Sequence, residues 1–410
     1  MLFRLAARLE AAAKHPASIT ALVVALAIYG GVICTRRMGD FDVYHRAATR
    51  LVAGEDVYRL EDPHRYLYAP ILVFLFVPLA PLPLVLGKVV WFLGNLWFAK
   101  RAVVLSLRLV FRAERAPPGL VCLLLLFTFR FLDNNIAHGQ TNLFLLWLVL
   151  EAYALAGAGK AAMAGLALAG AIAVKPFAAI LCLEIALRRD LRFLAGTVFG
   201  FVLLLAAPAL WWGPAYPDVV RDWMTVVSDQ VGHYETGNKI NQSISAFTYR
   251  LFHHYPYGSP VVTLSEGAVS AITAALHAVF LTVLVRRSVR ADRAGGLAAG
   301  GPAVQDLALY LTYATIALPY SWKYYFVNLL LPLTVLLARL HEGRSLWLLA
   351  GLACVFVLNF LPGFRLIGRQ GALFFQLASF HFVAAAAVFV LVDRFGERLA
   401  GTFPSRRSVC

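Results

Sequence analysis

Two carboxylates stand two residues apart directly after the first apolar run of the chain. Asp40 and Asp42 belong to residues 39–44, which read GDFDVY. A carboxylate within hydrogen-bond reach of a hydroxyl can remove its proton and so create a nucleophile. Carboxylates beside a bilayer are costly, and contact with lipid does not explain them. The alternative role for either acid is structural, as a helix N-cap or as the partner of a neighbouring arginine.

Two lysines have the chemistry of an anion site. Lys175 precedes Pro176 and interrupts an apolar stretch, and Lys323 stands among Trp322, Tyr324 and Tyr325. A lysine at a membrane-embedded helix break can bind an anionic group. The alternative for both lysines is snorkelling to the membrane interface, and the aromatic neighbours of Lys323 suit that position.

A third group of polar side chains lies in residues 228–250. Amides and cations of this kind suit sugar hydroxyls and a phosphate; the alternative is an ordinary solvated loop. The members that we single out are His233, Asn241, Gln242 and Arg250. We expect no metal site, because the adjacent pair at residues 253–254 lacks zinc spacing and the five cysteines show no metal or disulfide pattern.

Composition sets the class of protein. Of the 410 residues, 60% are hydrophobic and only 14% are charged, which is typical of a polytopic membrane protein. The formal net charge of +15 is spread over short clusters between apolar runs. That distribution follows the positive-inside rule and argues against nucleic-acid binding.

The apolar runs predict an all-α protein that crosses the membrane about twelve times. We expect an interfacial helix over residues 1–16, because Arg4 and Arg8 oppose an apolar face. Prolines at 78, 81 and 83 break the run 71–80, which we interpret as a re-entrant or juxtamembrane helix. The expected spans are 18–35, 84–108, 118–132, 141–157, 160–174, 177–187, 192–213, 262–286, 304–319, 322–340, 345–361 and 374–393.

This topology puts both termini and the basic clusters in the cytoplasm, and the polar turns on the opposite face. We expect one domain, residues 1–410, with two extracytoplasmic parts: the acid-rich loop with juxtamembrane helices at 36–83, and the segment 213–261. Residues 36–67 hold six of the 22 acids. The turn 133–142 joins them, with residues 139–142 as a possible helix cap. Residues 287–303 read as a flexible cytoplasmic linker.

Motifs in a fixed order over about 300 residues resemble glycosyltransferase family 87. The motifs are Asp40-Phe41-x-Val43-Tyr44, Gly54-x-x-x-Tyr58, Tyr68-x-Pro70, Gly139-Gln140-x-Asn142, Lys175-Pro176, Asn241-Gln242-Ser243 and Ser321-Trp322. Two departures concern Ala69, where the family often has a second proline, and Lys323-Tyr324-Tyr325, where many members carry histidines.

The resemblance implies a C-type (GT-C) fold with about twelve helices. We expect the protein in the bacterial inner membrane, with its active site on the extracytoplasmic face to which the charge pattern assigns the polar turns. It implies an inverting hexosyltransferase, with mannose as the first expectation. The donor would be a polyprenyl-phosphate sugar and the acceptor a lipid or glycan hydroxyl. Asp40 matches the family's general base. The substrate-binding candidates at motif positions are Tyr44, Tyr68, Gln140 and Asn142. Asp42 falls on a variable position and is a candidate as a neighbour that supports Asp40. Lys175, Lys323 and Arg250 are the candidates for neutralising the leaving phosphate.

Two other functions remain open from the sequence. A flippase or transporter of lipid-linked sugar would suit broken helices such as that at Lys175, although the chain shows no inverted repeat. The second alternative function is that of a ligase or polymerase that uses a lipid-diphosphate donor. With cations present we expect no cofactor, although Asp40 with Asp42 could hold a divalent metal.

Overall fold

The computed structural model describes residues 2–112, 115–232, 235–293, 303–343 and 345–396, and they form an all-α protein. Its first helices are α1 (Leu2–Ala13), α2 (Pro16–Arg36), α3 (Gly39–Ala53), α4 (Pro70–Phe76), α5 (Leu84–Phe111), α6 (Leu120–His138), α7 (Asn142–Gly157), α8 (Ala161–Val174), α9 (Ile180–Leu187) and α10 (Leu191–Ala206). The others are α11 (Ala209–Trp212), α12 (Tyr216–Gly232), α13 (Ile244–Phe252), α14 (Glu266–Arg293), α15 (Ala303–Ala317), α16 (Leu330–Gly343), α17 (Leu346–Phe360), α18 (Phe364–Leu377) and α19 (Phe380–Phe395). Short 3-10 helices are η1 (Val77–Leu79), η2 (Pro176–Ala179), η3 (Gly213–Ala215) and η5 (Lys323–Leu329).

The expectation of an all-α polytopic membrane protein is confirmed. Within the described residues, six helices are long and apolar enough to cross a membrane, or up to seven if the pair α18–α19, bent by 57°, is one span. Five shorter apolar helices accompany them, among them α7 and α8. Fewer helices than the twelve expected therefore reach spanning length. One reason is that the two helices on either side of Lys175, Ala161–Val174 and Pro176–Leu187, each correspond to an expected span and are both too short to cross a membrane.

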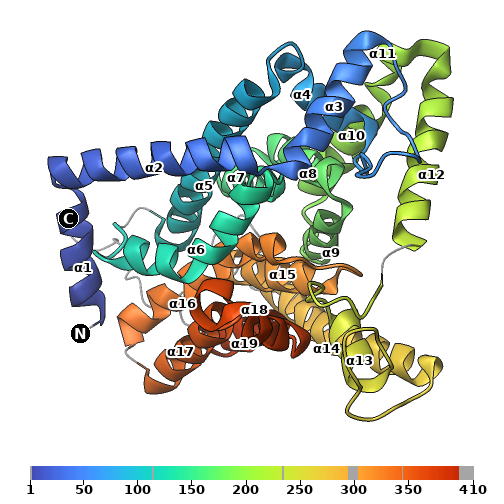
Figure 1. Ribbon diagram of the computed structural model, residues 1–410. Helices are drawn as coiled ribbons and strands as arrows, with labels where there is room; N and C mark the ends of the chain where they lie inside the picture. Colours follow the sequence, from blue (N-terminus) through green and yellow to red (C-terminus); the bar gives the residue numbers. More distant parts are fainter. Residues whose placement is uncertain (1, 113–114, 233–234, 294–302, 344, 397–410) are drawn as a thin grey trace.

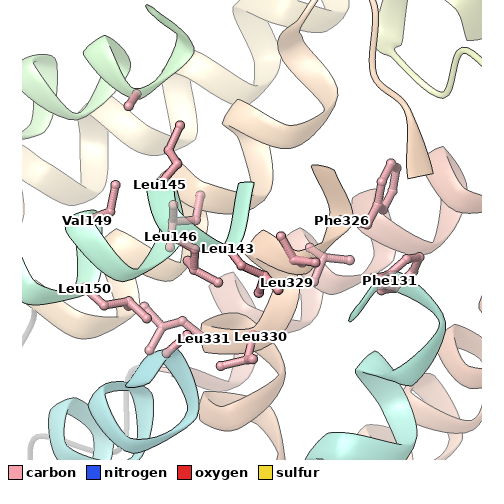
Figure 2. Packing of buried hydrophobic residues seen from close by; sticks show 14 of the residues in the cluster. Phe131, Leu143, Leu145, Leu146, Val149, Leu150, Phe326, Leu329, Leu330 and Leu331 are labelled. Carbon is pink, nitrogen blue, oxygen red and sulfur yellow. The ribbon is translucent and has the colours of Figure 1, made fainter. Parts of the chain in front are cut away.

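The helices surround an apolar core, and several of them also carry apolar side chains on their outer faces. Figure 1 shows α2 running from α1, at the left, toward α3, with α12 at the upper right and α13 at the lower right. In the centre, Leu143, Leu146 and Leu150 of α7 lie near Leu330 and Leu331 of α16 (Figure 2). The outer faces of α2 and α10 carry many exposed apolar side chains. Hydrocarbon is the natural surrounding of such faces.

Some polar segments are more helical than the sequence suggested. The expected turn 133–142 is helical as far as His138, because α6 continues until Gly139 ends it. The segment 213–261 contains the helices α12 and α13. The expected linker 287–303 begins as helix, since α14 continues to Arg293, and residues 294–302 lie outside the described part of the chain.

Candidate functional site

Asp40 is placed by a sharp turn between α2 and α3. Met38 takes a left-handed conformation (φ 68°), and its amide donates to the carbonyl of Ala137 at 3.0 Å. This conformation costs a non-glycine residue about 1–2 kcal/mol. Asp40 follows in the first turn of α3, where the helix dipole favours a negative charge. The strained turn therefore fixes a carboxylate against the end of α6.

Gly139 allows α3 to approach that end. It terminates α6 with φ 71°, and a Cβ there would lie 2.9 Å from the Cβ of Phe41. A side chain would thus meet both an unfavourable backbone conformation and a steric clash. The contact brings Asp40, on α3, beside Gln140, the residue after the glycine. Asp40 and Gln140, which are 100 residues apart in the sequence, therefore come together because residue 139 has no side chain.

Gln140 bridges the proposed base and a cation. Its side chain hydrogen-bonds to the Asp40 carboxyl, and its Oε1 accepts from the Nζ of Lys175 at 3.1 Å. Burial raises the pKa of Asp40 above its ordinary value, and the hydrogen bond from Gln140 opposes that rise. The charges of His138, Lys175 and His64 also lower it. The carboxylate and the ammonium group therefore act on each other across an amide.

Lys175 is enclosed by amides and aromatic rings. It lies between the apolar helices α8 and η2, outside both, and is buried. Its Nζ donates to the Oδ1 of Asn142 at 2.8 Å and lies 4.4 Å from the ring centroid of Tyr325. The rings of Tyr68 and Tyr324 are at 5.7 and 5.6 Å. Burial lowers the pKa of Lys175 to about 7, with the charge of Asp40 acting against that change.

Tyr44 and Tyr68 form one wall of the site. Their hydroxyls are 2.8 Å apart, and the Tyr68 hydroxyl also lies 3.4 Å from Gln140 Oε1. Thr141 donates to Tyr68 at 3.3 Å. The expectation that residues 139–142 cap α7 is not met at Thr141, whose side chain makes no capping bond. The tyrosine pair and Gln140 are therefore one hydrogen-bonded group.

Asp42 has a different environment from Asp40. Its Oδ1 lies 2.7 Å from the Nζ of Lys88, a buried residue of α5. Lys88 also donates to the carbonyl of Arg37 at 2.8 Å, at the end of α2. Asp42 thus joins α3 to α5 and α2. The structure separates the two carboxylates that the sequence left side by side.

Sequence reasoning missed a chain of buried amides behind Lys175. Asn142 donates to Asn135 at 3.2 Å, and Asn135 donates to Asn95 at 3.0 Å. Asn95 in turn donates to the carbonyl of Trp91 at 3.0 Å. The chain fixes the orientation of Asn142 toward the lysine. The signal for Asn95 was present, because an amide inside an apolar helix is costly and needs a partner.

Asn241 and Gln242 make bonds within the protein at a junction of loops. Asn241 Oδ1 accepts from the amide of Ser321 at 2.9 Å, and its Nδ2 donates to the carbonyl of Pro319 at 2.9 Å. Gln242 donates to the carbonyl of Gln376 at 2.9 Å. These amides connect the segment before α13 with the segment before η5.

Arg250 and Lys323 have neighbours other than the Gln140 group. Arg250 donates to Ser379 Oγ at 2.6 Å and to the carbonyl of Asn238 at 2.9 Å. Lys323 is half-buried, and the nearby charges that act on it are those of Arg130 and Asp133. His233 lies outside the described residues. Of the three candidate cations Lys175, Lys323 and Arg250, all of them described residues, Lys175 is the one that contacts Gln140.

The described residues offer no ready metal centre. No group of three or more His, Cys, Asp or Glu side chains among them is arranged to hold an ion. Asp40 and Asp42 have different contacts, one with an amide and the other with a lysine.

A buried carboxyl and a lysine on the two sides of one amide lie in a polytopic helical protein. The sequence model of Glycosyltransferase family 87 matches residues 66–301, more than half of the chain. The chain therefore belongs to this family and is a membrane glycosyltransferase. Gln140, Asn142 and Lys175 lie within the match, and Asp40 precedes it. Searches of curated proteins and of solved structures returned no match.

Proposed function

We propose that this glycosyltransferase moves a hexose, mannose first among the candidates, from a polyprenyl-phosphate sugar to a hydroxyl of a lipid or glycan. Asp40 is the general base and Lys175 the cation that receives the leaving phosphate. The observation that carries the proposal is the bridge of Gln140 between these two groups. A carboxylate that can take up a proton and a cation that can bind the leaving group, on the two sides of Gln140, suit an in-line displacement.

The reaction balances with these two side chains. Asp40 takes the proton of the acceptor hydroxyl, whose oxygen attacks the anomeric carbon of the donor sugar. The bond from that carbon to the phosphate oxygen breaks on the opposite side, which inverts the configuration. The electron pair leaves with the polyprenyl phosphate, and the charge of Lys175 stabilises it.

The surroundings of Lys175 favour it over Lys323 and Arg250 as the phosphate partner. Its two amide bonds and its aromatic neighbours hold the ammonium group without a carboxylate within ion-pair distance in the described residues. An ammonium group that has no carboxylate as its ion-pair partner can donate a hydrogen bond to a phosphate oxygen. Arg250 already donates to a carbonyl and a hydroxyl.

A monophosphate donor suits the site better than a diphosphate. A single lysine among amides and tyrosines supplies one positive charge to the leaving group when it is protonated. We propose that it does so without a divalent metal. We also propose the extracytoplasmic face of a bacterial inner membrane as the location, with cytoplasmic termini, because the basic clusters then obey the positive-inside rule.

The direct experiment supplies purified protein in proteoliposomes with radiolabelled polyprenyl-phosphate mannose and an extract of bacterial lipids. We expect the label to move to a lipid or glycan acceptor, with polyprenyl monophosphate as the second product and no loss on chelation with EDTA. Transfer that requires a lipid-diphosphate donor, or that stops with EDTA, would refute this assignment of donor and chemistry.

A further inference from the structure

A polar hollow lies between α13 and α14, and it shares no lining residue with the group around Gln140. It encloses about 380 Å³, within the size range of small-ligand pockets. Its polar lining comes from these two helices and from Thr236 in the segment before α13; the helical members are Ser245, Tyr249, Glu266, Ser270, Thr273 and His277. Figure 1 shows α13 at the lower right of the molecule, beside α14. We call this hollow the α13–α14 groove.

The polar residues of α14 that line the groove lie on one face of the helix. Glu266, Ser270, Thr273 and His277 recur at the helical period and so share one face. They extend over about 16 Å of the helix. Residues 266–290 of this helix are long and apolar enough to cross a membrane, where polar side chains are costly unless they have partners or a function. A polar stripe on such a helix therefore needs partners within the protein or a ligand.

The inner part of the stripe is already bonded, and the outer part is accessible. Thr273 Oγ1 lies 2.6 Å from that of Thr248, and His277 Nδ1 lies 2.9 Å from the Tyr313 hydroxyl. Glu266 and Ser270 are exposed. The groove therefore has a fixed base and an open mouth that carries a carboxylate and a hydroxyl.

We propose that the α13–α14 groove binds the sugar portion of the acceptor. Hydroxyls that both donate and accept, with one carboxylate as a strong acceptor, match the alternating hydroxyls of a neutral carbohydrate. The ring of Tyr249, half-buried in the wall, offers an apolar surface to the C–H face of a sugar. Glu266 opposes the binding of a phosphate. This inference rests on the proposed function, since it names the acceptor side of the same reaction.

The groove is connected to the Lys175 region through short segments of chain. Thr236, in the groove wall, follows Glu235, whose carbonyl accepts from the Tyr320 hydroxyl. Asn241 accepts from the amide of Ser321. These bonds tie the wall to the segment that leads into Tyr324 and Tyr325, beside Lys175. The hydrogen bonds at Tyr320 and Ser321 would thus link the segment that binds the acceptor to the segment beside Lys175.

The test measures sugar binding without any donor. Methyl α-D-mannopyranoside is titrated against the full chain in lipid nanodiscs, because maltoside detergents would compete, and binding is followed by saturation-transfer NMR. We expect the dissociation constant to rise about fivefold in Ser270→Val and about tenfold in Glu266→Gln. Thr282→Val, on the opposite face of α14 by the helical period, is the matched control and should bind like wild type.

A second measurement separates this inference from the proposed function. In the transfer assay the two groove variants should raise the KM for the acceptor and leave the KM for the donor unchanged. No probe binding to the wild type, or equal binding by all four proteins, overturns the groove as a sugar site. Probe binding that depends on Ser270 and Glu266 sustains it even if the donor proves to be a different lipid.

Discussion

At the scale of single residues, partners distinguish two carboxylates that look alike in the sequence. Asp40 meets an amide and Asp42 meets a buried lysine. The motif order singled out Asp40 as the expected base, and its placement beside Gln140 is compatible with that role. Lys88 could not be paired with Asp42 from the sequence, because their contact depends on how α3 packs against α5. The same holds for Gln140 and Lys175, which were separate candidates until the fold joined them.

The first prediction is a bell-shaped pH dependence of kcat/KM. The base must be deprotonated, so activity falls as the pH drops through the pKa of Asp40, which burial raises above its ordinary value. The cation must be protonated, so activity falls as the pH rises through the pKa of Lys175, which burial lowers to about 7.

The Lys175→Arg variant tests the alkaline limb, because a guanidinium keeps its charge over this range. We expect that limb to move to higher pH while the acid limb stays in place, even if the maximal rate falls. An unchanged alkaline limb would show that a group other than Lys175 sets it. Initial rates over pH 4–10, normalised to folded protein, provide the measurement.

At the scale of elements, the junction of α3 and α6 positions the site. Hydropathy was sufficient to predict the apolar helices, and the prolines predicted the short α4 and η1. The extension of α6 to His138 was not predicted, because polar residues after an apolar run read as a turn. Only the packed structure shows that the last turn of α6 is held by the start of α3 and capped by Gly139.

The second prediction concerns this junction. Gly139→Ala should reduce both activity and stability, because the added Cβ meets Phe41 at 2.9 Å and displaces α3 with Asp40. Gly54→Ala is a matched control: Gly54 ends α3 with φ 72°, and a Cβ there would meet nothing within 4 Å. It should therefore show only the backbone cost of about 1–2 kcal/mol. Thermal unfolding and transfer rates compare them, and equal loss of activity in both would contradict the positioning role.

At the scale of the whole molecule, a buried ionic network holds helices together away from the site. Arg188, the residue directly after α9, pairs with Glu184 at 3.0 Å and with Asp306 of α15 at 2.5 Å. Arg287 of α14 pairs with Asp306 at 3.2 Å and with Asp393 of α19 at 3.0 Å. The sequence assigned these arginines to charged cytoplasmic turns. Their burial could not be foreseen, because it depends on acids contributed by distant helices.

The third prediction is that Arg188→Met destabilises the protein by about 3–5 kcal/mol, because it leaves the buried Glu184 without its cation and Asp306 with Arg287 as its remaining partner. Arg221→Met is the control, since Arg221 pairs with Asp218 on the exposed surface of α12. An exposed pair of this kind contributes about 0–1 kcal/mol. Melting temperatures in detergent make the comparison, and similar melting of the two variants would refute a stabilising role for the network.

The central claim, that Asp40 is the general base, is tested most directly by one pair of variants. Initial rates of sugar transfer from labelled polyprenyl-phosphate mannose are measured for purified Asp40→Asn and Asp42→Asn, each normalised to folded protein. Loss of a general base predicts a fall of about 10²–10⁴-fold for Asp40→Asn. Loss of a partly exposed ion pair predicts a fall of less than about tenfold for Asp42→Asn. Wild-type rates in Asp40→Asn, or a dead Asp42→Asn beside it, would contradict the account.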